Sequence, residues 1–280
     1  MFTLTGFGDE ISPKLDEQMQ VLASEGIRYI ELRGVENKNV TVLSEAELSD
    51  VRAGLDRKGF KISAIGSPIG KVRIDEDFEA HLKLFEHCLD LADFFGTPFI
   101  RIFSYYPPEG QKIARFREEV LRRMQQKTEM AARRGKILLH ENEHAIYGET
   151  AERCRDIHAG IRSPHLRATF DFANFVLDGE DPLQAFTLLR DYVGYVHVKD
   201  ALRPSKDHGD PGRMVPPGEG DGQIEPILRQ LAGDGKDYFL SLEPHLSFAG
   251  SMYGHSGPDL FTLAIRALKK ILTNIGAKWR

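Results

Sequence analysis

The chain has little cysteine and no long apolar run. Its 280 residues include two cysteines, Cys88 and Cys154, so a disulfide framework is not expected. The amino-terminal stretch lacks a basic region followed by an apolar segment, and no window approaches about 18 apolar residues, which argues against a signal peptide and a membrane span. These absences predict a protein of the reducing cytoplasm with no membrane partner.

An excess of basic residues is also missing. The chain carries 37 Lys and Arg against 42 Asp and Glu, a net charge of −5. This balance gives no electrostatic signature of a nucleic-acid partner. Hydrophobic residues make up 41% and charged residues 28%, as in ordinary globular proteins, and the length suffices for one large α/β domain or two small ones.

What the sequence does contain is a regular alternation of strand-like and helix-like segments. The predicted strands span 2–7, 27–32, 60–65, 98–103, 137–141, 167–171, 193–199 and 238–243. The predicted helices span 15–25, 44–59, 75–95, 109–134, 149–161, 181–192, 223–231 and 257–275. A capping box at Ser44 and Glu47, Pro182 at a first helical position and Gly26 after a helix support these limits. No composition shift marks a boundary, so residues 1–280 are predicted to form a single domain.

Strictly alternating strand and helix units predict a parallel sheet with right-handed crossovers. Eight such units in about 250 residues match the size of a closed (β/α)8 TIM barrel, which is the predicted α/β fold. The rival is an open, doubly wound sheet. No G-x-G-x-x-G follows the first strand, which weakens this rival while leaving it open.

Four consecutive predicted strands end in residues that bind metals. Glu141, Asp171, His197 and Glu243 close strands five to eight. Strand alternation turns them into the barrel, at the carboxyl-terminal rim where active sites of this fold lie. Any one of them alone would be an ordinary salt-bridged rim residue, but three carboxylates gathered there would repel each other unless a divalent cation joined them. Mixed carboxylate and imidazole ligands suit one Mn²⁺, Mg²⁺, Co²⁺ or Zn²⁺ ion.

Short motifs extend this pattern along the chain. They are H-E-N-E-H at 140–144, F-D-F-A-N at 170–174, H-V-K-D at 197–200, G-E-G-D-G at 218–222 and L-S-L-E-P at 240–244. In their order and spacing the chain resembles, over nearly its whole length, the xylose isomerase-like superfamily of sugar phosphate isomerases and epimerases, which includes D-tagatose 3-epimerase, hydroxypyruvate isomerase, inosose dehydratase and the apurinic-site endonucleases. The resemblance implies a barrel in which Glu141, Asp171, His197 and Glu243 bind one metal. Its members are often dimers or tetramers, so a homo-oligomer is expected.

The resemblance also implies a chemistry. A ketose chelates a divalent cation through neighbouring oxygens, and the cation stabilises an enediolate. In the epimerase relatives, the glutamates that match Glu141 and Glu243 are expected to act as the acid and the base, so the resemblance implies these roles here. The leading hypothesis is therefore an isomerase or epimerase of a small sugar or polyol ketone. A metal-dependent dehydratase of the inosose type shares the first step. An apurinic-site endonuclease is less favoured, because Asn174 stands where several relatives have a further histidine. A non-catalytic sugar-binding barrel is also less favoured.

Further polar residues near these motifs are candidate substrate ligands. They are Lys199, His144, Arg101, Asn174 and His245. Ion pairing or an exposed loop position explains several of them equally well.

Other rim and loop residues have less defined roles. Glu31 is a substrate contact or an internal ion pair, and Asp9 and Glu10 are expected to hydrogen-bond at the rim. The Pro- and Gly-rich segment 201–222, with His208 and Arg213, is predicted to be a long loop that acts as a lid or a subunit contact. Phe248 and Tyr253, after the last strand, are candidate apolar substrate walls.

Overall fold

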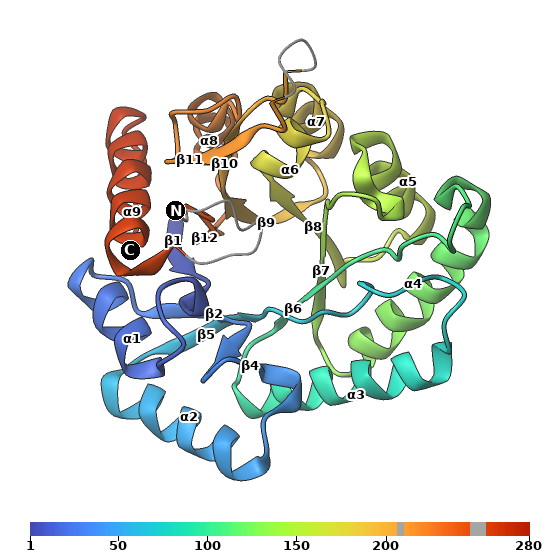
Figure 1. Cartoon of the computed structure of the whole chain (residues 1–280), viewed down its shortest axis with the longest axis horizontal. Helices are drawn as coiled ribbons and strands as arrows, with labels where there is room; N and C mark the ends of the chain where they lie inside the picture. The colour runs from blue at the N-terminus through green and yellow to red at the C-terminus, as the bar shows by residue number, and fades with distance from the viewer. Residues whose placement is uncertain (206–209, 247–255) are drawn as a thin grey trace.

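The computed structural model describes residues 1–205, 210–246 and 256–280. Eight parallel strands lie in the order β1-β12-β9-β8-β7-β6-β5-β2 and form a ring inside a shell of helices (Figure 1). The strands are β1 (Phe2–Gly6), β2 (Tyr29–Leu32), β5 (Lys61–Ile65), β6 (Phe99–Ile102), β7 (Ile137–Glu141), β8 (Leu166–Asp171), β9 (Val193–Val198) and β12 (Tyr238–Leu242). The predicted TIM barrel is confirmed.

The ring closes between β1 and β2 by two different contacts. At the carboxyl-terminal end of these strands, Phe7 and Glu31 form a single parallel bridge. At the other end, the last residues of the chain pair with β1, where the Leu4 N–H donates to the Arg280 carbonyl at 2.8 Å and the Arg280 N–H to the Phe2 carbonyl at 3.1 Å. The chain end thus takes the place that β2 leaves beside β1.

The helical shell follows the signals in the sequence. Its helices are α1 (Leu15–Ser24), α2 (Glu45–Lys58), α3 (Phe78–Phe94), α4 (Arg117–Arg133), α5 (Ala151–Ile161), α7 (Pro182–Leu189), α8 (Ile224–Ala232) and α9 (Gly257–Asn274). Ser44 and Glu47 form the predicted capping box of α2, and Gly59 ends that helix with φ of 68°. The predicted start of α4 at residue 109 was too early, because a short 3₁₀ helix, η3 (Ile113–Phe116), comes first.

Short elements at the carboxyl-terminal side of the barrel were missed. They are the hairpin of β3 (Gly34–Val35) and β4 (Lys38–Asn39), helix α6 (Phe172–Leu177), and the hairpin of β10 (Asp200–Leu202) and β11 (Arg213–Val215). The prediction of a long loop over 201–222 was therefore wrong in its secondary structure. His208, Phe248 and Tyr253 lie outside the described residues.

Apolar side chains fill two separate layers. The larger layer lies between strands and helices, and a smaller one fills the barrel around Ala64, Leu139 and Tyr195. The Tyr195 and Phe239 rings stack there with centroids 5.7 Å apart. Because side chains alternate, this apolar floor places the next inward residues of the same strands at the polar mouth.

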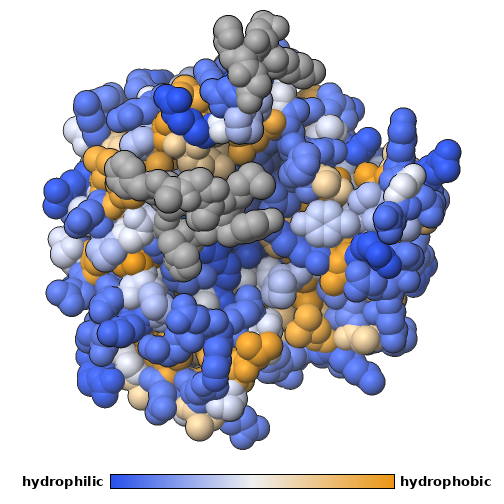
Figure 2. Space-filling model, in the orientation of Figure 1, coloured by the Kyte–Doolittle hydropathy of each residue, from blue (hydrophilic) through white to orange (hydrophobic). Residues whose placement is uncertain are grey.

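The outer surface shows no continuous apolar face in the view of Figure 2, where hydrophobic residues form small patches among hydrophilic ones. No helix in the described part of the chain is long and apolar enough to cross a membrane.

Candidate metal centre

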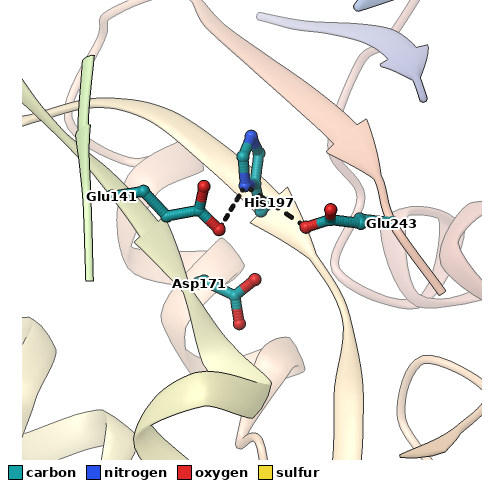
Figure 3. Close-up of side chains that lie close together, drawn as sticks. All are labelled: Glu141, Asp171, His197 and Glu243. Atoms are coloured by element: carbon teal, nitrogen blue, oxygen red, sulfur yellow. Dashed lines mark ion pairs between the residues drawn. The ribbon is translucent and has the colours of Figure 1, made fainter. Parts of the chain in front are cut away.

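Four buried side chains meet at the mouth of the barrel. Glu141 ends β7, Asp171 ends β8, His197 lies near the end of β9, and Glu243 follows β12. One ligand atom from each lies within 4.8 Å of the others. In Figure 3, Glu141 and Glu243 reach toward His197 from opposite sides, and Asp171 lies beneath them. The structure thus brings together the four residues predicted as metal ligands.

The His197 ring has a distinct partner on each nitrogen. Its Nδ1 lies 3.1 Å from Glu141 Oε1 and 3.7 Å from Glu243 Oε2, and its Nε2 lies 3.2 Å from Glu31 Oε2. Histidines that bind metals usually donate their other ring N–H to a carboxylate, which fixes the ring and its tautomer. Glu31 is fully buried and occupies this orienting position, which favours the ion-pair interpretation of Glu31 over a substrate contact.

Three buried atoms of the centre make no hydrogen bond of good geometry with the described residues. They are Asp171 Oδ2, His197 Nδ1 and Glu243 Oε2, and they meet charged neighbours only as ion pairs, at 3.1 Å between His197 Nδ1 and Glu141 Oε1 and 3.5 Å between Asp171 Oδ2 and Lys199 Nζ. Burying polar atoms whose hydrogen bonding is incomplete is costly. A divalent cation bound by three carboxylates and one imidazole would engage these atoms, so the donor set fits the ion that the sequence predicts.

The charges of the centre are strongly coupled to one another. Burial raises the pKa of Asp171 to about 7, although Lys199 opposes this. Burial also raises the pKa of Glu141, but His197 and Arg101 lower it further, to about 2. Burial lowers the pKa of His197, but Glu141 and Glu31 outweigh it and raise this pKa well above its usual value. Without a cation, these shifts favour the protonated forms of His197 and Asp171, and a metal that binds the deprotonated ligands must displace any proton that they carry.

Lys199 and Asn174 form a polar pair beside Asp171. The Lys199 ammonium donates to Asn174 Oδ1 at 2.9 Å and lies 3.5 Å from Asp171 Oδ2 and 3.9 Å from Glu243 Oε2. The Asn174 N–H donates to Asp171 Oδ1 at 2.8 Å and so caps helix α6. An amide paired with an ammonium therefore lies beside the Asp171 carboxylate.

Asn142 joins the strands that carry the first two ligands. Its side-chain amide donates to the Asp171 carbonyl, and its Oδ1 accepts from the Asp171 N–H, both at 3.0 Å. This reciprocal pair fixes the end of β8 against the end of β7, and explains the Asn next to Glu141 in the sequence.

Asp200 explains the spacing of two other motifs. Its carboxylate accepts the N–H groups of Gly218, Gly220 and Gly222 at 2.8, 3.0 and 2.9 Å. A Cβ at Gly220 would lie 2.4 Å from Asp200 Oδ1, so this approach requires glycine. The H-V-K-D and G-E-G-D-G motifs are one structural unit that ties residues 218–222 to the end of β9. The lid and subunit-contact roles of the 201–222 segment stay predictions.

Two arginines lie beside the glutamates. Arg101 Nη1 lies 3.3 Å from Glu141 Oε2, and Arg33 Nη1 lies 2.7 Å from Glu243 Oε1. Both guanidinium groups lie over the Phe7 ring, at 4.5 Å for Arg33 and 4.9 Å for Arg101. Sequence reasoning missed Arg33, although alternation along β2 from the inward-facing Glu31 would have placed it at the mouth.

The two candidate histidines occupy different places. His245 Nε2 lies 3.0 Å from Glu10 Oε1 and 3.5 Å from Glu243 Oε1, at the edge of the centre. His144 is 76% exposed and its Nδ1 pairs with Asp178 Oδ1 at 2.6 Å and Glu149 Oε1 at 3.5 Å. His144 therefore belongs to a separate group on the rim.

The comparisons with known proteins agree with this geometry. The family model "Xylose isomerase-like TIM barrel" matches residues 19–271. The chain belongs to this family. A 3-dehydroshikimate dehydratase of Bacillus anthracis is 24% identical over 268 residues, covering 91% of this chain and 90% of the relative.

Solved structures share the fold at low identity. A D-tagatose 3-epimerase-like protein superposes with a TM-score of 0.74 at 18% identity, covering 98% of each chain. An IolI protein with a bound zinc atom gives a TM-score of 0.74 at 16% identity, covering 98% of this chain and 97% of the other. The proteins that this chain resembles thus include a dehydratase and an epimerase-like protein, and another of them is described with a bound zinc atom.

Proposed function

We propose that this protein is a divalent-metal-dependent enzyme that removes a proton from the carbon next to the ketone of a small polyol ketone. The observation that carries the proposal is the convergence of Glu141, Asp171, His197 and Glu243, one ligand atom from each lying within 4.8 Å of the others, with buried atoms whose hydrogen bonding is incomplete. A cation held there would supply a Lewis acid for the ketone oxygen and its neighbour.

The side chains around this point have complementary roles. Glu141 and Glu243 flank it from opposite sides, so one carboxylate is placed to accept a proton at carbon and the other to return or deliver one (Figure 3). Burial lowers the pKa of Lys199, but Asp171 and Glu243 raise it above its usual value, so the ammonium stays charged. A fixed positive charge there stabilises a developing oxyanion or a leaving hydroxyl.

Dehydration is the outcome that we place first. The curated relative named as a 3-dehydroshikimate dehydratase aligns with 91% of the chain. On such a substrate the carbon between the ketone and the leaving hydroxyl loses its proton to a glutamate. The β-hydroxyl departs with a proton as water, and tautomerisation of the remaining ring gives 3,4-dihydroxybenzoate. Because of this relative, we rank the lyase, the runner-up on sequence alone, ahead of the isomerase in our proposal.

Isomerisation or epimerisation of a ketose is the second candidate. Two glutamates on opposite sides suit removal of a proton from one face and its return to the other, and a D-tagatose 3-epimerase-like protein shares the fold.

The buried free thiols of Cys88 and Cys154 support a cytoplasmic location, which we also propose.

Purified protein loaded with Mn²⁺ and incubated in D₂O with 3-dehydroshikimate, inososes and ketoses distinguishes these outcomes by NMR. We expect water loss with 3-dehydroshikimate, and loss of activity in Glu243→Gln and Glu141→Gln. Deuterium exchange at carbon without water loss would support the epimerase instead. Absence of any exchange or elimination across this panel would contradict the proposal, as would full activity of Glu243→Gln.

A further inference from the structure

Arg101 is a buried guanidinium with few partners. The residue is 5% exposed and projects into the barrel from β6. Its contacts with oxygen atoms are long, at 3.3 Å to Glu141 Oε2 and 3.4 Å to the Gly66 carbonyl, and its Nε has no hydrogen-bond partner among the described residues. A guanidinium offers five donors, and burying them without short contacts is costly. The donors of Arg101 therefore point to a ligand that supplies acceptors.

Arg33 lies over the same aromatic ring, at 4.5 Å from the Phe7 centroid. Its Nε donates to Asp9 Oδ2 and its Nη1 to Glu243 Oε1, both at 2.7 Å, which fixes the plane of the guanidinium, while its Nη2 has only a longer contact of 3.9 Å with Glu10 Oε1. Arg33, Asp9 and Lys38 also line an open pocket of about 290 Å³ beside the β3–β4 hairpin. There is thus space for a ligand group next to Arg33, in a pocket that Phe7 does not line.

Both arginines converge on one carboxylate oxygen. Glu243 Oε1 lies 2.7 Å from Arg33 Nη1 and 3.9 Å from Arg101 Nη1, while Glu243 Oε2 faces the metal ligands. The geometry between the two guanidiniums is therefore already one that accepts a planar carboxylate. Forked donors match such a group with charge-assisted, bidentate bonds, and the Phe7 face holds both forks in place.

We infer that Arg33 and Arg101 form a carboxylate-binding subsite beside the metal centre, and that the substrate is a polyol keto acid. This inference rests on the proposed function and names its substrate class. The ketone end of the substrate lies at the metal ligands, and its carboxylate lies between the arginines and the pocket lined by Arg33 and Lys38. A neutral ketose leaves this subsite without an anion.

A pair of ligands that differ only in charge tests the subsite. 3,4-Dihydroxybenzoate and 3,4-dihydroxybenzamide share a ring and two neighbouring oxygens that chelate a metal, and the amide lacks the negative charge. Calorimetric titration into Mn²⁺-loaded protein should show benzoate binding at least about tenfold tighter than the amide. Arg33→Met and Arg101→Met should remove this preference, and Arg101→Lys should restore part of it. Arg73→Met, a substitution on an exposed arginine paired with Asp75, should leave both affinities unchanged.

The Mn²⁺ affinity of each variant is measured first. Equal losses of both ligands, together with weaker Mn²⁺ binding in Arg33→Met, would show that Arg33 only positions Glu243 and would overturn the inference. Equal affinity of the two ligands for the unmodified protein would overturn it as well, while the proposed metal-dependent function would stand. Absence of Mn²⁺ binding to the unmodified protein would overturn both.

Discussion

His140 and Glu141 are neighbours on β7, yet they point into two buried polar regions with opposite electrostatics. Glu141 belongs to the metal centre, where the pKa values of His197 and Lys199 are raised. His140 points to the helix layer and forms, with Lys127 and His158, what we call the helix-side cluster. Burial lowers the pKa of His140 to about 3, with Lys127 contributing, and that of Lys127 to about 7, with Arg123 contributing.

The opposite pKa shifts in the two regions follow from the charged groups that surround the buried side chains. At the mouth each cation faces carboxylates, whose attraction exceeds the cost of burial. In the helix-side cluster, the Lys127 ammonium lies over the Tyr105 ring at 4.6 Å, and neither it nor the ring nitrogens of His140 and His158 have a hydrogen-bond partner among the described residues. Burial alone drives side chains toward the neutral form, so the charge at the mouth depends on its acidic residues, which are also the groups able to bind a cation.

Asp171→Asn removes one carboxylate from the mouth and should have the largest effect. We expect Mn²⁺ affinity to fall at least about 100-fold, because a direct ligand is lost. The pKa of Asp171 is about 7 in the folded protein and exceeds its usual 3.8. Ionisation of Asp171 therefore lowers the stability of the metal-free protein increasingly as pH rises from about 4 to 7. The variant should therefore be more stable than the unmodified protein at pH 8, by up to about 4 kcal/mol, and this gain should vanish near pH 4.

Urea unfolding of metal-free protein at both pH values measures this gain. Asp181→Asn is the matched control, since Asp181 also caps a helix but is exposed, and asparagine caps as well as aspartate. Equal stability of Asp171→Asn and the unmodified protein at pH 8 would contradict the account of the mouth.

Lys127→Met removes a buried ionisable group from the helix-side cluster, as Asp171→Asn does at the mouth. The pKa of Lys127 is about 7 in the folded protein, below its usual 10.5. Between these pH values the unfolded chain binds a proton on Lys127 that the folded chain does not. The free energy of unfolding therefore falls as pH drops from about 10.5 to 7. Methionine removes this cost, and we expect about 2–4 kcal/mol of added stability at pH 7 that shrinks by pH 10. Urea unfolding at both pH values measures it.

Lys136→Met is the contrasting variant. Lys136 is also buried, but its ammonium lies 2.7 Å from Asp93 and 3.1 Å from the Thr97 carbonyl. Its loss leaves those partners unpaired, so it should not stabilise. A gain in Lys136→Met as large as in Lys127→Met would show that burial, and not the missing partner, decides the effect.

The sequence predicted the barrel and the meeting of Glu141, Asp171, His197 and Glu243 at its mouth, because strand alternation and parallel topology are local rules that decide which side chains converge. Their role as metal ligands stays a prediction. Ile137, Leu139 and Glu141 share the inward face as expected, and the floor of Tyr195 and Phe239 lies beneath the polar rim. The limits of α4 were harder, because the choice between the 3₁₀ turn at Ile113 and an earlier helix start depends on tertiary packing.

The partners around the ligands were less predictable. That Glu31 would contact His197 depends on how β2 approaches β9 across the barrel, which no spacing in the chain encodes. Asn142 and Asp200 bond to backbone groups of distant segments, so their residue type alone says little. His144 lies in the right motif but turns outward to Asp178, because the loop after β7 sets its direction.

Glu31→Gln tests whether the mouth needs its orienting carboxylate. Glutamine keeps the size of the side chain but weakens the acceptor for His197 Nε2–H, so Mn²⁺ affinity should fall about 10- to 100-fold. The proton on His197 is also held less tightly, so the decline in Mn²⁺ affinity with falling pH should become shallower. Calorimetric Mn²⁺ titrations at pH 6 and 8 measure both effects. Glu143→Gln, in an exposed pair with Lys71, should change neither, and an equal loss there would point to a general charge effect.

His158→Phe tests the helix-side cluster at acid pH and should have the smallest effect. Burial, with His140 and Arg167 contributing, lowers the pKa of His158 well below 6.5. The unfolded chain therefore binds a proton below pH 6.5 that folded His158 refuses, and stability falls as pH drops. This slope amounts to about 1.4 kcal/mol per pH unit for one histidine. Phenylalanine can keep the stacking on Tyr192, at 5.0 Å between centroids, and should reduce the slope between pH 6 and 5 by this amount. His87→Phe, on a half-buried residue of α3, is the control in the same urea titrations. If His158→Phe leaves the slope of unfolding free energy against pH unchanged, His158 gains a proton in the folded protein, as the histidines of the mouth do.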